Sequence, residues 1–188
     1  MKNTNISIYV PVYNGEKTIE RCINSVLEQS IKPSNILILN DSSNDNTLEI
    51  LKKYEGLICI KSNSSNLGLS HSRNIAVNEL KTRYIASIDA DVELDKNWLE
   101  ILYSSVLKNN AILAGGRMYE KYLSNPFNLW RSLRIGQQWG DKDLNDPSFI
   151  FGCNNILDTE KIEKKHIYLF EGNYFKTNGE DLEFSKYL

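Results

Sequence analysis

The chain has 188 residues, of which 41% are hydrophobic and 24% charged, and this composition is that of one globular domain. Its net charge of −2 argues against a general nucleic-acid-binding protein, which would usually be basic. The N-terminus has no signal-peptide hydrophobic region. No window approaches about 18 consecutive apolar residues, so this piece is expected not to span a membrane.

Segments typical of strands and of helices alternate through the first hundred residues. The apolar run at 36–39 is continuous, which suits a strand covered on both faces, and Asp45 is placed to cap the helix that follows. Such alternation implies right-handed β-α-β units and a parallel sheet. The expected strands are 6–11, 36–39, 57–60 and 84–88, and the expected helices are 19–27, the segment after Asp45, the segment through Ala76 and the segment from Asp95.

Beyond residue 110 the pattern is less regular. Strands are expected at 111–118 and 149–157, and the last nine residues, from Glu180, read as the start of a helix. Three far-apart cysteines, an odd number, indicate buried thiols in a reducing compartment. The tryptophans are expected in the core, with a platform for a sugar as the alternative, and they are Trp98, Trp130 and Trp139.

Polar side chains follow each of the four expected strands. Because ligands bind at the carboxyl ends of strands in open α/β sheets, these groups are expected to converge at one rim. The convergence brings together aromatic, amide, carboxylate and guanidinium groups, which predicts a binding site. The segments are Pro11–Glu16, Asn40–Ser43, Asn66–Gly68 leading to Arg73, and Asp89–Asp91.

Asp89 and Asp91 are candidate metal ligands. Two carboxylates at i and i+2 can face the same side of an extended chain and hold Mg²⁺ or Mn²⁺ through oxygen. Ten aspartates produce roughly half an Asp-x-Asp pair by chance, and Asp141-Lys142-Asp143 is a second such pair. Asp89 closes an apolar strand, whereas Asp143 lies in a charged loop, so the first pair is favoured. The alternative for Asp89 and Asp91 is a turn that ends a strand.

Each of the other rim residues also has an ordinary structural explanation. Asp41 suits an Asx-turn, and Arg73 suits a solvated helix position. Pro11 and Tyr13 can simply end and cover a strand. His71 is expected at the surface or in packing.

Taken together, five motifs stand in the order and spacing of family 2 glycosyltransferases, and the chain resembles that family strongly over residues 6–95. The resemblance implies the GT-A fold, an α/β fold with a Rossmann-like, mostly parallel sheet flanked by helices. It also implies one domain over 1–188, with a nucleotide-binding half at 1–95 and an acceptor-side half at 96–188 that stops early. The motifs are Pro11-Val12-Tyr13-Asn14, Asn40-Asp41-Ser42-Ser43-Asn44-Asp45, Asn66-Leu67-Gly68 with Arg73-Asn74, Asp89-Ala90-Asp91, and, more weakly, 152–155 with 179–182.

The resemblance also implies roles for single residues in binding a nucleoside diphosphate sugar. Asp41 would accept a hydrogen bond from the base, which suits uracil, and Arg73 would lie near the phosphates or support the pocket. Asp89 would touch the ribose or the metal, and Asp91 would bind Mn²⁺ or Mg²⁺. The remaining nucleotide-binding candidates are Pro11, Tyr13, Asn14, Glu16, Ser42, Asn66 and Ala90.

On the acceptor side, Asp181 resembles the family's general base, with Glu180 positioning it or the acceptor. The reaction implied is an inverting transfer to a saccharide or lipid-linked acceptor. The protein is expected in the cytoplasm, with peripheral membrane association through a segment absent here. The chain departs from the family where Asn40 and Ser42 replace the usual Asp and Gly, and where 170–179 lacks Gly-Gly-Phe.

Two other functions compete with this one. A sugar nucleotidyltransferase would carry a Gly-rich loop with Arg or Lys after the first strand, where this chain has Pro11-Val12-Tyr13-Asn14. A catalytically inactive nucleotide-sugar-binding domain would not need both Asp91 and Asp181, although the short C-terminus favours it. A Rossmann dehydrogenase is excluded because no G-x-G-x-x-G follows any strand.

Overall fold

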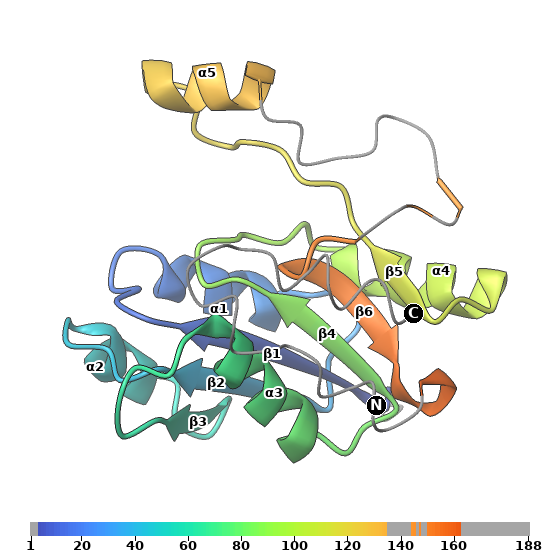
Figure 1. Ribbon diagram of the computed structural model, residues 1–188, viewed down its shortest axis with the longest axis horizontal. Helices are drawn as coiled ribbons and strands as arrows, with labels where there is room; N and C mark the ends of the chain where they lie inside the picture. Colours follow the sequence, from blue (N-terminus) through green and yellow to red (C-terminus); the bar gives the residue numbers. More distant parts are fainter. Residues whose placement is uncertain (1–3, 135–143, 146, 148–149, 163–188) are drawn as a thin grey trace.

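The structure, a computed structural model, describes residues 4–134, 144–145, 147 and 150–162. In this part of the chain, helices pack on both faces of one mixed sheet (Figure 1). The strands are β1 (Ile6–Val12), β2 (Asn35–Asn40), β3 (Cys59–Ser62), β4 (Tyr84–Ile88), β5 (Leu113–Gly115) and β6 (Asn154–Asp158). The helices are α1 (Ile19–Leu27), α2 (Thr47–Lys52), α3 (Leu69–Glu79), α4 (Trp98–Asn109), α5 (Pro126–Arg134) and the 3-10 helix η1 (Thr159–Lys161).

The sheet has the strand order β3-β2-β1-β4-β6-β5. The first four strands are parallel to one another, as the alternation of strands and helices predicts. β6 runs antiparallel to both β4 and β5 and lies between them. The expected mostly parallel α/β sheet is therefore confirmed, with an antiparallel pair added at one edge.

Alternate side chains of the central strands enter two separate cores. Ile6, Ile8 and Val10 point toward α1, α2 and α4, whereas Tyr9 points toward α3 on the other face. Strands covered on both faces need nearly continuous apolar sequence, which explains the runs read from the sequence. Each fully buried Ile or Leu side chain stabilises the fold by about 1.5–3 kcal/mol relative to exposure.

Three of the predicted strands differ clearly from the observed ones in position or length. The third strand begins at Cys59 instead of 57, because Gly56, with φ of 87°, and Leu57, which is 62% exposed, belong to the preceding turn. The predicted strands 111–118 and 149–157 shorten to β5 and β6, since only those residues find partners in the sheet. An apolar run next to a turn does not indicate at which residue the hydrogen bonding to the neighbouring strand ends.

Of the cysteines, only Cys22 is fully buried as expected. Burial, together with the nearby carboxylates of Asp91, Asp89 and Glu93, raises the pKa of the Cys22 thiol well above its usual range. Cys59 is exposed because β3 is an edge strand, and Cys153 is half-buried.

The prediction for Trp130 was wrong. Trp98 is buried, and its indole Nε1 donates to Asn154 Oδ1 at 2.6 Å, but Trp130 on α5 is 53% exposed and stacks on Phe127. Figure 1 shows why: α5 stands away from the sheet at the end of an extended segment. Within the described ranges, no helix is both long and apolar enough to cross a bilayer.

Candidate functional site

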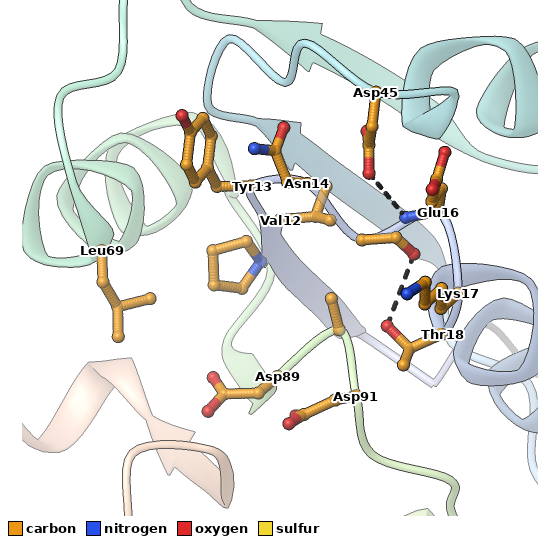
Figure 2. A pocket seen from close by; sticks show the side chains of 13 residues that line it. Val12, Tyr13, Asn14, Glu16, Lys17, Thr18, Asp45, Leu69, Asp89 and Asp91 are labelled. Atoms are coloured by element: carbon orange, nitrogen blue, oxygen red, sulfur yellow. Dashed lines mark hydrogen bonds between the residues drawn. The ribbon is translucent and has the colours of Figure 1, made fainter.

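A cavity of about 660 Å³ opens at the carboxyl ends of β1 and β4. These strands are neighbours, although the chain leaves β1 toward β2 and returns to β4 only after β3. Ligands of open α/β sheets bind at such reversals of strand order. Figure 2 shows the β1–α1 loop on one side of the cavity and Asp89 and Asp91 facing it.

Most of the residues predicted for nucleotide or metal binding do line this cavity. They are Pro11, Tyr13, Asn14, Glu16, Asp89, Ala90 and Asp91. The sequence analysis missed the other lining residues, which are Val12, Gly15, Lys17, Thr18, Asp45 and Leu69. All of these except Leu69 lie within or next to the motifs that follow β1 and β2. Their closeness to those motifs was the one sequence signal that could have identified them as site residues. Leu69 reaches the cavity only because α3 begins beside it, which no local pattern reveals.

The backbone N–H groups of the β1–α1 loop are already bonded to side chains of the β2–α2 loop and of Thr47, the first residue of α2. Three consecutive N–H groups donate to these side-chain oxygens: Asn14 to Ser43 Oγ (2.9 Å), Gly15 to Thr47 Oγ1 (2.8 Å) and Glu16 to Asp45 Oδ2 (3.0 Å). Asn14 has a positive φ of 53°, a conformation that asparagine tolerates better than most residues. The loop therefore differs from a phosphate-binding loop, whose N–H groups point at the ligand.

Asp41 lies at the end of β2, only 4% exposed, and does not line the cavity. Its Oδ1 accepts from Asn63 Nδ2 at 2.6 Å and from the Leu67 N–H at 2.9 Å. Its Oδ2 accepts from the Gly68 N–H at 2.7 Å, directly before α3. Three of about four acceptor positions of this carboxylate are thus used to fix the start of α3. Direct contact of Asp41 with a base stays a prediction.

Arg73 is not the solvated helix residue that was the ordinary alternative for it. Its side chain on α3 is buried, and its Nη2 lies 3.5 Å from Oδ1 of Asp89. α3 packs against one face of the sheet, and the Arg73 guanidinium reaches Asp89 from there, while the Asp89 side chain stays 35% exposed. Arg73 therefore holds one of the two candidate metal ligands in place.

The segment after Asp91 is anchored through Glu93. Its carboxylate accepts from Lys121 Nζ and from the Tyr122 hydroxyl at 2.5 Å, and it pairs with Arg21 Nε at 3.2 Å. The hydrogen bonds from Lys121 and Tyr122 lower the pKa of Glu93. These contacts join the aspartate segment to α1 and to the chain that follows β5.

The residues present fit a divalent metal only as part of a shared site. Nowhere in the described ranges do three or more His, Cys, Asp or Glu side chains gather as a metal site. Asp89 and Asp91 both line the cavity, and carboxylate oxygens suit Mg²⁺ or Mn²⁺. Two carboxylates leave coordination positions for phosphate oxygens and water, as a diphosphate site requires.

The remaining predicted residues that the structure describes are Ser42 and Asn66. Ser42 is half-buried with φ of 61°, and Asn66 is exposed, and neither lines the cavity. Glu180 and Asp181, predicted to act on the acceptor, lie outside the described residues, as does the expected helix from Glu180.

Known proteins share this architecture. The crystal structure of Staphylococcus aureus TarS 1-349 in complex with UDP superposes with a TM-score of 0.72 at 18% identity, over 96% of this chain and 53% of that chain. The mannosyltransferase PcManGT of Pyrobaculum calidifontis, in complex with GDP-Man and Mn²⁺, superposes with a TM-score of 0.63 at 14% identity, over 85% of this chain and 46% of that chain. These likenesses confirm the expected GT-A fold.

Sequence comparison identifies the family. Glycosyltransferase GlyA of Streptococcus pneumoniae serotype 4 is 31% identical over 173 residues, which are 91% of this chain but only 24% of that protein. This chain therefore spans about a quarter of that relative and about half of TarS 1-349. The sequence profile described as glycosyl transferase family 2 matches residues 7–165, so the chain belongs to glycosyl transferase family 2.

Proposed function

We propose that this chain is the donor-binding domain of an inverting glycosyltransferase that uses Mn²⁺ or Mg²⁺. It transfers a sugar from a nucleoside diphosphate sugar, preferentially a UDP-sugar, to a hydroxyl of a saccharide or lipid-linked acceptor. The observation that carries the proposal is the cavity between β1 and β4, which Tyr13, Asp89 and Asp91 all line. Family membership and the nucleotide complexes of TarS and PcManGT support it.

The charges of the cavity argue for a metal ion. Among its lining residues, four carboxylates (Glu16, Asp45, Asp89 and Asp91) stand against one ammonium group, that of Lys17. The backbone N–H groups of 14–16 are already used by the β2–α2 loop. A diphosphate would meet net negative charge here, so a cation bound by Asp89 and Asp91 has to offset it. Such an ion, when bound, would also supply Lewis-acid stabilisation of the leaving diphosphate.

The chain's own residues would divide the remaining work. Pro11 and Tyr13 contact the base and ribose from the β1 side. Asp181 takes the proton of the acceptor hydroxyl as its oxygen attacks the anomeric carbon from the face opposite the diphosphate. The bond from the sugar to the phosphate oxygen breaks, its electron pair leaves with the diphosphate, and the configuration inverts in one step.

Calorimetric titration of UDP, with and without Mn²⁺, tests the donor site. We expect Mn²⁺-dependent binding, weakened roughly tenfold or more (about 1.4 kcal/mol) by Asp91→Ala. Asp95→Ala is the control, because Asp95 is exposed and outside the cavity. Equal UDP affinity in wild type and Asp91→Ala, with or without Mn²⁺, contradicts the metal assignment.

Asp181→Asn tests the acceptor side. Removing the proton acceptor should reduce transfer by roughly 100-fold or more, while the UDP affinity in Mn²⁺ stays unchanged. The measurement is donor turnover with a panel of saccharide acceptors alongside UDP calorimetry. Unchanged turnover would remove Asp181 as the base. Donor binding without hydrolysis or transfer in the wild type would support the inactive binding domain instead.

A further inference from the structure

The loops after β1 and β2 are joined by hydrogen bonds running in both directions. In one direction, the N–H groups of 14–16 donate to the side chains of Ser43, Asp45 and Thr47. In the other, the Asn44 N–H donates to Asn14 Oδ1 at 2.9 Å, and Asn46 donates to Glu16 Oε2 through its N–H at 3.2 Å and its Nδ2 at 3.1 Å. We call this set of six bonds the loop clasp.

Within the loop clasp, the half-buried Asp45 is bonded to the buried Thr47. Asp45 accepts from the Glu16 N–H through Oδ2, and from both the N–H and the hydroxyl of Thr47 through Oδ1. The Thr47 hydroxyl is fully buried and also accepts from the Gly15 N–H. Burial raises the pKa of Asp45, but the bonds from Thr47 and Glu16 lower it by more, so the carboxylate stays charged.

The loop clasp forms part of the wall of the cavity. Asn14, Glu16 and Asp45 line the cavity, and Figure 2 shows the Asp45 carboxylate meeting the Glu16 backbone at its edge. Asn14 and Ser42 hold positive φ values of 53° and 61°, which cost free energy unless neighbouring contacts stabilise them. The bonds therefore hold a loop conformation that an isolated segment would not keep.

We infer that Asp45 is a positioning residue for donor binding, acting through Thr47 on the β1–α1 loop and so on Tyr13. This rests on the proposed function. A loop that is already ordered before the ligand binds loses little conformational entropy on binding, so the affinity for the ligand is higher. The Glu16 side chain is likewise held by Asn46, which assigns it to loop positioning.

Three variants test the inference through the Kd of UDP in Mn²⁺ and the KM and kcat for a UDP-sugar. Asp45→Ala and Thr47→Val should each raise the Kd and KM roughly tenfold with a smaller change in kcat, because the loop is loosened but still reaches its bound conformation. Thr47→Ser keeps the hydroxyl and should restore wild-type values. Thr47→Val preserves shape, so it remains informative if Asp45→Ala folds poorly.

Matched controls exist elsewhere in the chain. Asp95 Oδ1 accepts from the Asn97 N–H at 2.9 Å, the same local bond that Asp45 makes to Thr47, but at the start of α4. Thr82 Oγ1 donates to Ser7 Oγ at 2.7 Å at the opposite end of the sheet. Asp95→Ala and Thr82→Val should both keep the wild-type Kd for UDP.

Each result decides between explanations. Weaker binding by Asp45→Ala with normal binding by Thr47→Val overturns the inference, since Asp45 would then act without Thr47, either through its own bond to the Glu16 N–H or by direct contact with the nucleotide. Wild-type Kd in both variants also overturns it. If the wild type binds no UDP in Mn²⁺, the proposed function itself fails.

Discussion

The aspartates of this chain have different roles because different groups surround them. Asp41 and Asp45 are covered by N–H and hydroxyl donors that fix two loops. Asp89 and Asp91 face the cavity, where one is steadied by Arg73. A carboxylate that accepts several protein donors stabilises structure, whereas one turned toward a cavity is available for a metal ion or ligand.

Asp158 on β6 gives a prediction about pH. Burial raises its pKa, but the bond from Arg83, at 2.9 Å, and the Glu160 N–H lower it by more, so it titrates below the usual 3.8. A folded pKa below the unfolded one contributes stability that is present above the unfolded value and is lost as pH falls through the folded value. Asp158→Asn should therefore lower the free energy of unfolding by about 2 kcal/mol at pH 7.

Urea unfolding at pH 7 and at pH 3 measures this effect. The difference between wild type and Asp158→Asn should shrink at the lower pH. Glu49→Gln, which removes an exposed pair with Lys52 on α2, is the control and should change stability little at either pH. A difference that stays constant with pH would show that packing, and not charge, makes Asp158 stabilising.

At the scale of elements, β6 joins the parallel part of the sheet to β5 and α4. Its residue Asn154 is buried and accepts from Trp98 Nε1, which ties α4 to the sheet. The Gly116 N–H in turn donates to the Asn154 backbone oxygen at 3.0 Å. The antiparallel edge of the sheet is thus stabilised by side-chain hydrogen bonds as well as by the backbone hydrogen bonds between strands.

Gly116→Ala should disturb this junction. A Cβ at Gly116 would lie 2.5 Å from Asn154 Oδ1, so the amide must move away from Trp98. Overpacking of this kind costs about 1–3 kcal/mol of unfolding free energy, measurable by urea unfolding. In an Asn154→Ala background the same change should cost much less, as a double-mutant cycle shows. If Gly116→Ala lowers the free energy of unfolding equally in the wild type and in Asn154→Ala, its effect does not arise from contact with the Asn154 side chain.

At the scale of the whole molecule, two hydrophobic cores hold the sheet while its rim stays open. β1 and β4 contribute to both cores, and the cavity opens at their carboxyl ends. Because these central strands are fixed on both faces, the loops at their ends have a rigid base. Ligand binding at the rim is therefore linked to the stability of the whole fold.

The linkage gives a thermal prediction. UDP with Mn²⁺ at 100 times its Kd should stabilise the fold by about 2.7 kcal/mol and raise the Tm by about 5–10 °C in a thermal-shift assay. EDTA should remove the shift, because the cavity's own lining is acidic. A shift that survives EDTA would mean that side chains alone hold the diphosphate.

The sequence by itself determined the strands around the site and the motifs that end them. β4 was predicted with its observed bounds, and β1 and β2 within one residue, since buried strands need continuous apolar runs. The motifs after β1 and β4 do line the cavity. Local pattern was sufficient there because position along a strand decides which residues reach the rim.

Only the tertiary structure decided what each rim side chain contacts. The donors to Asp41 lie 22 to 27 residues away, and the partners in the loop clasp lie 29 to 32 residues away. Burial of Arg73, exposure of Trp130 and the insertion of β6 beside β4 likewise depend on how distant elements pack. A sequence motif specifies a group and its place on an element, but its hydrogen-bond partners follow from strand order and loop packing.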